Sequence, residues 1–363
     1  MSTVAGVLNI TDSEHAFIAN VGQQLVFDAV NQVLADYNED VAKAVGIFIE
    51  KDTEKFKFRH LLPAGGQLPL MGREGAAPSM KRIGYNDVAL PLTQKGVEIS
   101  GSRVNLAYLT IEELDAQLTT VTIQDLNTLR DEILTALFEN DNSTFDDPVH
   151  GDLTIVRLAN TDGSTYPPVL GSETEADDEH YLVSGYTVAS IADANNPVVT
   201  LRDEIAEHYG GIGSRGREFV YLHGADQTAY LAAITGYVAC SDQYTIIGQA
   251  TADVRYFPEN VPGRIHGRLS GAWLSEWDGW IPDTYGLMIL LTVPKPLYRR
   301  NDPAITGLER GLRLVASDVN HPMHRSSYEN RYGVAVVNRL PAAVMLVTCD
   351  AFYSPPSAYA WPP

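Results

Sequence analysis

Apolar side chains recur at helical spacing over residues 13–44 and predict an amphipathic helix there. Thr11 and Glu14 match a capping box, in which each side chain accepts a hydrogen bond from the backbone N–H of the other residue. Gly22 interrupts the pattern and costs about 1 kcal/mol relative to alanine, so we expect a weak point there. The chain therefore opens with a helix, and a break inside it is compatible with the pattern.

After residue 46 the hydrophobic pattern changes from helical to alternating. Apolar and polar residues alternate over 46–60 and again over 88–99, which is typical of strands with one covered face. Between them, residues 63–78 contain three prolines and four glycines, which predict a loose tip. We therefore expect a long two-stranded ribbon. Because an isolated ribbon is marginally stable in water, it needs a surface to lie on, and a neighbouring subunit would provide one.

Residues 111–139 carry one helical pattern that no glycine or proline interrupts. Thr110 and Glu113 match a second capping box directly before it. At 1.5 Å per residue such a helix reaches about 44 Å, whereas the mean helix has about a dozen residues. The apolar positions do not keep a strict heptad, so a coiled coil is the weaker interpretation and a structural beam is favoured.

The remainder of the chain mixes short helices and short strands and has no internal repeat. Helical spacing returns over 199–209 and 225–234. Alternating or continuous apolar runs predict strands within 148–158, 219–222, 240–300 and 331–348.

Charge is distributed unevenly along the chain. The protein carries 26 Lys and Arg against 46 Asp and Glu, a net charge of −20. Residues 51–103 contain nine basic and five acidic residues, so this segment is +4 and the rest of the chain is −24. A positive ribbon on a negative body can rest on another copy of that body. Self-assembly and an ordinary surface hairpin with scattered charges both fit this distribution.

Composition and the N-terminus exclude several classes of protein. With 45% hydrophobic residues the chain can bury a sizeable core, and its 363 residues predict roughly two to three domains. The sequence has no apolar run long enough to span a membrane and no secretory signal at its N-terminus. Cys240 and Cys349 are too few for a disulfide framework, which favours a reducing cytoplasm. The acidity disfavours a nucleic-acid-binding protein but is compatible with a container whose inner wall repels nucleic acid.

Two short motifs suggest ligand binding but lack the context that it needs. Residues 211–216 match G-x-G-x-x-G, yet a helix is expected before them and a strand after them, the reverse of the order that binds dinucleotides. A helix-to-strand connection is the favoured interpretation. His321 and His324 could share a metal ion, but no cysteine or third histidine lies nearby and Pro322 disfavours a regular helix.

The other candidate groups also favour structural roles. His223 follows a predicted strand, where catalytic groups can lie, but it has no evident nucleophile or base partner. The carboxylates of 173–179 lack the alternating ligand pattern of a calcium loop. An aromatic group could bind a sugar or base, although the core of a strand pair is favoured. Its members are Trp273, Trp277, Trp280 and Tyr285. We therefore expect no catalytic, cofactor-binding or metal-binding residues, and no enzyme activity.

Six stretches of the chain keep a characteristic order and spacing. They are NDVALPLTQKGVEIS (86–100), LTIEELDAQLTTVTIQDLNTLRDEILTALFEN (109–140), DPVHGDLTIVRLANTDGSTYPPVLGS (147–172), NNPVVTLRDEIAEHYG (195–210), NVPGRIHGRLSGAWLSEW (260–277) and ENRYGVAVVNRLPAAVMLV (329–347). Together they resemble the major capsid proteins of tailed bacteriophages, which have the Johnson fold first described for a Hong Kong phage. The resemblance covers most of the chain from about residue 80 to residue 349 and rests on order and spacing rather than on one motif.

That resemblance implies an α+β Johnson fold in which the long beam is the spine helix of a peripheral domain. The positive ribbon corresponds to an extended β-hairpin loop that lies across a neighbouring subunit. The implied divisions are an N-terminal arm (1–45), the extended loop (46–108), the peripheral domain (109–185), an axial domain (186–300), a return to the peripheral domain (301–350) and a C-terminal tail (351–363).

The same resemblance implies a major capsid protein that self-assembles into hexamers and pentamers of an icosahedral head around double-stranded DNA. Its expected partners are itself, a portal and scaffolding or decoration proteins, and it would touch DNA without sequence-specific contact. The sequence has no scaffolding segment at its N-terminus, so a separate scaffold, or none, is expected. The protein would lie in the virion after assembly in the host cytoplasm. The expected inter-subunit contacts of the loop are Lys55, Lys57, Arg59, Arg73, Lys81, Arg82 and Lys95.

Two alternative functions and one covalent option accompany this interpretation. An encapsulin-like compartment of the same fold would enclose a protein cargo. A soluble enzyme would use a pocket near His223. Some members of the family join a loop lysine to an asparagine of a neighbour with the help of a glutamate. Lys81 or Lys95 with Asn338 would be the candidates in this chain, and nothing in the sequence fixes their geometry.

Overall fold

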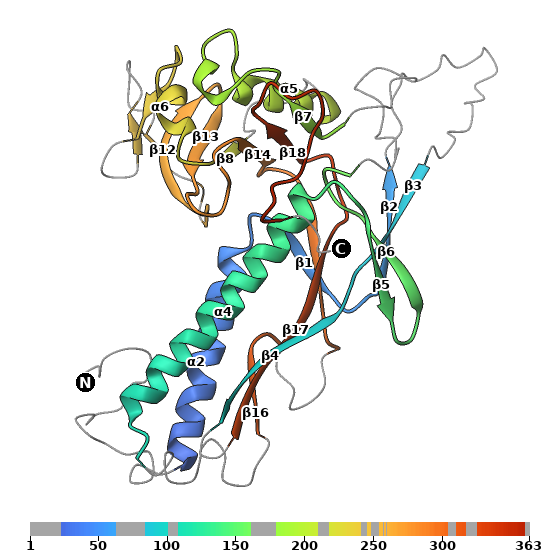
Figure 1. The fold of residues 1–363 in the computed structure, drawn as a ribbon, viewed down its shortest axis with the longest axis vertical. Helices are drawn as coiled ribbons and strands as arrows, with labels where there is room; N and C mark the ends of the chain where they lie inside the picture. Colours follow the sequence, from blue (N-terminus) through green and yellow to red (C-terminus); the bar gives the residue numbers. More distant parts are fainter. Residues whose placement is uncertain are drawn as a thin grey trace, which may run out of the picture.

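The computed structural model describes residues 23–62, 84–100, 108–160, 179–209, 218–240, 245–247, 254–256, 258, 260–303, 310–316 and 325–359. In these ranges the chain forms two long helices, a long five-stranded sheet, a seven-stranded sheet at one end and three two-stranded sheets. Figure 1 shows the long helices and the long sheet extending away from the seven-stranded sheet.

The two long helices run side by side (Figure 1). α2 spans Gln23–Ala44 and α4 spans Ile111–Phe138. Val30 of α2 and Leu118 of α4 are fully buried and belong to the same core cluster. The amphipathic pattern that predicts each helix therefore provides the surface on which the other helix packs.

The predicted capping box begins α4. The Thr110 hydroxyl accepts a hydrogen bond from the Glu113 backbone N–H at 3.2 Å, and the Glu113 carboxylate accepts one from the Thr110 N–H at 3.0 Å. The box satisfies two backbone donors that the first turn of a helix leaves without an intrahelical partner. The box expected at Thr11 and Glu14 lies outside the described residues.

The long sheet lies against α4. Its strands are β1 (Ile49–Thr53), β4 (Thr93–Ser100), β15 (Leu297–Asn301), β16 (Arg313–Ala316) and β17 (Arg325–Val336). β4, β15 and β16 pair antiparallel with β17, and β1 pairs in parallel with β15. Val334 of β17 packs in the core that includes α4, whereas Ala335 packs on the opposite face, because alternate strand residues point to opposite sides.

The seven-stranded sheet is covered on both faces. In order across the sheet its strands are β7 (Tyr181–Val183), β18 (Ala342–Leu346), β14 (Tyr285–Leu290), β8 (Phe219–His223), β13 (Ala272–Glu276), β12 (Arg264–Leu269) and β9 (Val238–Ala239). α5 (Pro197–Tyr209) and α6 (Gln227–Ala232) pack on one face. The C-terminal end of α4 packs on the other. This second contact joins the seven-stranded sheet to the long helices.

Three antiparallel pairs complete the described strands. β2 (Lys57–Leu62) and β3 (Gly84–Ala89) form what is called the ribbon below. The ribbon stands beside the hairpin of β5 (Ser143–Asp147) and β6 (Gly151–Ile155) in Figure 1. The third pair is β10 (Thr245–Ile247) with β11 (Val254–Tyr256), and a short helix η1 spans Val188–Ser190.

The structure confirms the predicted helices where it describes them. The range expected at 13–44 is helical from Gln23 onward, and its earlier turns, with Gly22, lie outside the described residues. The beam at 111–139 is α4, and the two shorter predicted helices are α5 and α6. No helix in the described ranges combines the length and the apolar character needed to cross a membrane.

Two alternating runs are divided between sheets. Within 46–60, β1 joins the long sheet and β2 joins the ribbon, and within 331–348, β17 ends in the long sheet before β18 joins the seven-stranded sheet. β7 lies before residue 186, yet it belongs to the seven-stranded sheet. β15 begins within 186–300, yet it belongs to the long sheet. Alternation predicts a strand but carries no information about its partner strand, since the same pattern serves either sheet.

Candidate functional site

The base of the ribbon is the candidate site, because the sequence places the expected inter-subunit cations there. Lys57 and Arg59 of β2 are exposed, and Phe58 between them turns toward the body. The Phe58 ring meets Tyr298 of β15 edge to face, with 5.1 Å between the ring centroids. Lys51 covers both rings, its ammonium 4.9 Å from the Phe58 centroid and 4.7 Å from that of Tyr298. The alternation along β2 therefore presents cations outward and an aromatic anchor inward.

Asp87 of β3 is shared by both ribbon cations. Arg59 donates to the two Asp87 carboxylate oxygens at 2.6 Å and 2.8 Å, and the Lys57 ammonium lies 3.1 Å from the same group. These hydrogen bonds, above all that of Arg59, hold the pKa of Asp87 below its ordinary value. Since one carboxylate serves two cations, the outer face of the ribbon base keeps a positive charge. Lys55, just before β2, adds another exposed cation.

The ribbon is anchored in a small core of its own. Val88 and Leu90 are almost completely buried and pack with Ile155 of β6 and Ala335 of β17. The Leu90 backbone N–H also donates to the carbonyl of Phe56 at 2.8 Å, which closes the base. The direction in which the ribbon leaves the body is therefore defined within a single subunit.

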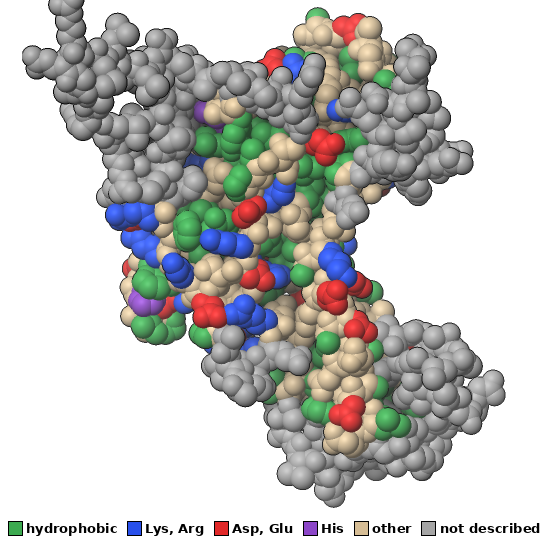
Figure 2. Space-filling model, turned by 180° about the vertical axis from the view of Figure 1, so that it is seen from behind, with side chains coloured by type: hydrophobic (Ala, Val, Ile, Leu, Met, Phe, Trp, Pro, Cys, Tyr) green, Lys and Arg blue, Asp and Glu red, His purple; other side chains and the backbone are tan. Residues whose placement is uncertain are grey.

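Positive side chains on this side of the molecule extend beyond the ribbon. Figure 2, which shows the molecule from behind, has Lys and Arg side chains spread over the middle of the face, mixed with acidic and hydrophobic ones. Arg299 of β15 pairs with Asp52 of β1 through two hydrogen bonds of 2.8 Å. Arg310 contacts Glu54. The acidic residues at the start of the positive segment are thus engaged within the chain.

Lys95 lies on β4 and turns inward rather than out from the ribbon. Its ammonium contacts the Glu132 carboxylate of α4 and lies 3.9 Å above the centroid of the Tyr332 ring. Burial raises the pKa of Glu132 above its ordinary value, and the charge of Lys95 opposes that rise. Lys95 therefore has an ion-pair partner in its own chain, and its contact with a neighbouring subunit stays a prediction.

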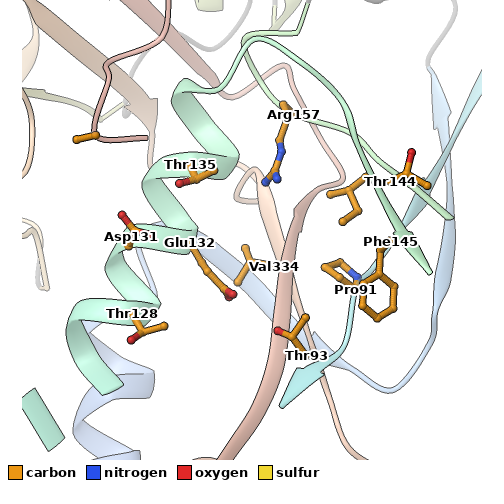
Figure 3. A pocket seen from close by; sticks show the side chains of 12 residues that line it. Pro91, Thr93, Thr128, Asp131, Glu132, Thr135, Thr144, Phe145, Arg157 and Val334 are labelled. Atoms are coloured by element: carbon orange, nitrogen blue, oxygen red, sulfur yellow. The ribbon is translucent and has the colours of Figure 1, made fainter. Parts of the chain in front are cut away.

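A cavity of about 390 Å³ adjoins Glu132, between α4, β17 and the base of the ribbon. Figure 3 shows Glu132 and Arg157 pointing into it from α4 and from the segment after β6. Arg157 donates to the Ser143 hydroxyl at 2.9 Å. Threonines and apolar groups form most of the remaining wall. Because Glu132 and Arg157 are both engaged by neighbours, their charges serve the contact between the helix, the hairpin and the long sheet.

The remaining predicted contact residues and the candidate crosslink are only partly described. Arg73, Lys81 and Arg82 lie outside the described residues. Asn338 is buried and its side-chain oxygen accepts a hydrogen bond from the Leu340 N–H at 3.3 Å. The inter-subunit role of these residues, and of Lys55, Lys57 and Arg59, stays a prediction.

His223 has the environment of a structural histidine. Its side chain is fully buried, Nδ1 lies 2.8 Å from the Gly224 carbonyl oxygen and Nε2 lies 2.9 Å from Nε2 of His266. Burial, the largest cause, lowers the pKa of His223 to about 3. Both ring nitrogens thus contact protein groups, which does not favour the alternative of an enzyme pocket around this residue.

The described tryptophans also have structural roles, whereas several other candidate groups are not described. Trp273 and Trp277 are buried in the core between the seven-stranded sheet and α4, as expected for the core of a strand pair. The motif at 211–216 lies outside the described residues, but α5 precedes it and β8 follows it, which is the predicted order. His321, His324 and the carboxylates before Glu179 lie outside the described residues. In the described ranges no group of three or more His, Cys, Asp or Glu is placed to hold a metal ion.

The acidic partners of Lys57, Arg59 and Lys95 could not be identified from the sequence. Asp87 is the partner of Lys57 and Arg59, and Glu132 is the partner of Lys95, yet neither acidic residue stands in a recognisable motif. Asp87 faces Arg59 directly in the ribbon register. A known register would have paired the two residues, but the loose tip expected at 63–78 supplies no turn from which to derive one.

Comparisons with known proteins support the fold. No protein-family model and no curated protein matches the sequence. A solved chain of Mycobacterium phage Patience is 17% identical, covers 92% of this chain and 91% of its own length, and superposes with a TM-score of 0.67. A chain from the capsid of the native GTA particle is 12% identical over 85% of this chain and 90% of its own, with a TM-score of 0.47. A chain of the holo-SrpI encapsulin complex from Synechococcus elongatus PCC 7942 is 10% identical over 85% and 89%, with a TM-score of 0.43.

The likeness to the phage Patience chain extends over nearly the whole length of both chains and shows that the two chains share a fold. The α+β Johnson fold expected from the sequence is confirmed, and this chain shares the fold of the phage Patience chain.

Proposed function

We propose that this chain is the major capsid protein of a tailed bacteriophage, which self-assembles into hexamers and pentamers and forms the icosahedral head around double-stranded DNA. The fold shared with the phage Patience chain over 92% of the sequence carries this proposal. The ribbon supports it independently, because its outward row of cations is complementary in charge to the acidic body of a neighbouring copy.

The ribbon is the element that joins subunits. Its base is fixed by the buried Val88 and Leu90, while Lys55, Lys57 and Arg59 remain exposed on the outside. The rest of the chain is −24, so a neighbouring body attracts the ribbon. Each exposed ion pair contributes about 0–1 kcal/mol, and the closed shell repeats the contact in every subunit. Arg73, Lys81, Arg82 and Lys95 complete the proposed set.

The proposed division of the chain follows the capsid plan. Residues 1–45 are the arm, 46–108 the extended loop, 109–185 the peripheral domain with α4 as its spine, and 186–300 the axial domain. Residues 301–350 return to the peripheral domain and 351–363 form the tail. The axial domain surrounds the symmetry axes of hexamers and pentamers.

The proposed partners are other copies of the chain, a portal, and scaffolding or decoration proteins. Packaged DNA is enclosed without sequence-specific contact, since a net charge of −20 repels phosphates. The protein is a structural component of the virion, assembled in the host cytoplasm, and it performs no catalysis.

Sedimentation of the purified protein over a range of concentrations, with negative-stain imaging of the heaviest fraction, tests this function. Closed particles, or hexameric and pentameric rings, are the expected result. A monomer or dimer that persists in every salt and pH condition would exclude a shell protein. Nuclease-protected DNA in particles from infected cells separates a phage head from a compartment that encloses protein.

A further inference from the structure

Arg300 of β15 connects three parts of the molecule where the chain leaves the ribbon. Its Nη1 donates to the Leu90 carbonyl oxygen at 2.9 Å and to an Asp147 carboxylate oxygen at 3.0 Å. Leu90 directly follows β3 of the ribbon, and Asp147 ends β5 of the hairpin. The Arg300 and Asp147 side chains are only 11% and 5% exposed, so solvent screens this contact weakly.

Asp147 is itself held in one orientation. The carboxylate oxygen that Arg300 does not contact accepts hydrogen bonds from the backbone N–H groups of Val149, at 3.0 Å, and His150, at 3.1 Å. These bonds, that of Val149 most of all, and the bond from Arg300 keep the pKa of Asp147 below its ordinary value. A charged and oriented carboxylate therefore fixes the guanidinium that holds the exit of the ribbon.

Gly333 completes the contact from the neighbouring strand. It lies opposite Arg300 in the pairing of β15 with β17. The chain that leaves the ribbon crosses this point so closely that a Cβ on Gly333 would lie 2.3 Å from the Pro91 carbonyl oxygen. No side chain larger than hydrogen fits there without displacing the Pro91 backbone.

We infer that Arg300, Asp147 and Gly333 form a seat that sets the direction of the ribbon in each subunit before assembly. This set of residues is called the ribbon seat below. Arg300 is a positioning residue: it acts through the backbone of Leu90 and through Asp147. The consequence for shell formation rests on the proposed function, whereas the geometry of the seat does not.

A fixed ribbon direction matters because of what docking costs. An arm that is ordered before association loses less conformational entropy when it binds a neighbour. It also presents its cations at one angle, which favours one inter-subunit geometry over others. Loosening the seat should therefore weaken assembly and admit irregular shells, while leaving the cores around the long helices unchanged.

Arg299 provides a matched control for Arg300. The two arginines are adjacent on β15, both are largely buried, and both make short contacts with an aspartate. Arg299, however, pairs with Asp52 and so joins two strands of the long sheet, β15 and β1. Replacement of either arginine by methionine removes one charge and one ion pair, but only Arg300→Met releases the ribbon.

The test follows the direction of the ribbon through a distance between two spin labels, measured by pulsed electron paramagnetic resonance. Spin labels are placed at His60→Cys in β2 and at Ile123→Cys, an exposed position on α4, after the two native cysteines have been replaced by serine. Labelled chain is diluted into an excess of unlabelled chain, so only distances within one chain are recorded, whatever the assembly state.

We expect a shifted or broadened distance distribution for Arg300→Met and an unchanged one for Arg299→Met. Gly333→Ala should shift the mean distance, because it pushes Pro91 away, and Arg300→Lys should fall between the wild type and Arg300→Met. Identical distributions for the two methionine variants would overturn the ribbon seat. If Arg300→Met does not fold, Asp147→Asn and Arg300→Lys, which keep a hydrogen-bonding side chain, decide the same question against Arg299→Met.

Assembly of the same proteins separates this inference from the proposed function. Shells from the wild-type chain together with unchanged distances in Arg300→Met would refute the ribbon seat alone. Shifted distances in Arg300→Met, together with a wild-type chain that never forms shells, would refute the capsid role alone. Shifted distances with irregular or fewer shells are the expected result.

Discussion

At the scale of single residues, two pairs of histidines lie at the seven-stranded sheet: His180, just before β7, meets His208 of α5, and His223 of β8 meets His266 of β12. Nε2 of His180 lies 3.0 Å from Nε2 of His208, and the corresponding distance between His223 and His266 is 2.9 Å. Each contact needs one ring nitrogen to accept a hydrogen bond from the N–H of the other ring, so a pair with both rings charged cannot form it. Burial is the main cause that lowers the pKa of His180 and of His223 to about 3.

Because of the buried histidine pairs, we expect the free energy of unfolding to fall as the pH is lowered. The folded-state pKa values near 3 lie below the ordinary value of about 6.5, so between these values the unfolded chain binds more protons. The stability that His180 and His223 contribute is complete above about pH 6.5 and is lost as the pH falls toward 3, by up to about 1.4 kcal/mol per pH unit for each histidine. Urea unfolding across this range measures the slope.

Substitution separates the histidines from the many carboxylates that also titrate in acid. His180→Gln combined with His223→Gln should flatten the pH dependence of the free energy of unfolding. His150→Gln, at an exposed histidine on the hairpin, is the control for the loss of a histidine. A slope that stays at the wild-type value in the double variant would contradict this account of the buried pairs.

At the scale of elements, local signals and distant partners behave differently. The Thr110 box and the uninterrupted pattern at 111–139 predict α4 almost to the residue, because caps and helical spacing act within a few positions of the chain. Strand pairing across the long sheet is non-local. The Leu90 and Asp147 partners of Arg300 lie 210 and 153 residues away in sequence, so neither could be predicted from the pattern around Arg300.

The same contrast applies to the ribbon. Alternation over 46–60 predicted its first strand, and the positive segment could be recognised from charge alone. The division of that run between β1 and β2, and the inward turn of Lys95 toward Glu132, depend on which surfaces meet after folding. Those features could not be predicted from the sequence.

The capping box of α4 makes a prediction at this scale. Thr110→Ala removes the hydroxyl that accepts from the Glu113 N–H and should lower the free energy of unfolding by about 1 kcal/mol. Thr110→Ser keeps the acceptor and should retain most of the stability. Thr120→Ala, at an exposed position inside the same helix, is the control. Equal unfolding midpoints for Thr110→Ala and Thr120→Ala would show that the box does not stabilise α4.

At the scale of the whole molecule, charge and shape have to act together. The positive ribbon projects from a body of charge −24, and its base is built into the subunit. Electrostatic attraction draws the ribbon toward a neighbour, and the buried base determines where it arrives. Because exposed charges are screened by salt, the onset of assembly should move to higher protein concentration as ionic strength rises.

Charge reversal tests whether the ribbon charge guides assembly. Lys81→Glu with Arg82→Glu, at positions outside the described residues, should leave the subunit folded and block shell formation. Lys43→Glu with Arg264→Glu changes the net charge equally, at exposed positions of α2 and β12 outside the positive segment, and should leave assembly largely intact. Circular dichroism reports folding and light scattering reports assembly. Normal shells from the first variant would show that the charge of the loop does not determine where the loop lies.

The most direct measurement is a cryo-electron microscopy reconstruction of the assembled protein. The account predicts a closed icosahedral shell of hexamers and pentamers, in which the ribbon of each subunit leaves its body at the angle set by Arg300 and lies across the neighbouring subunit. A small oligomer without a closed shell, or a shell in which each ribbon lies on its own subunit, would contradict the central claim.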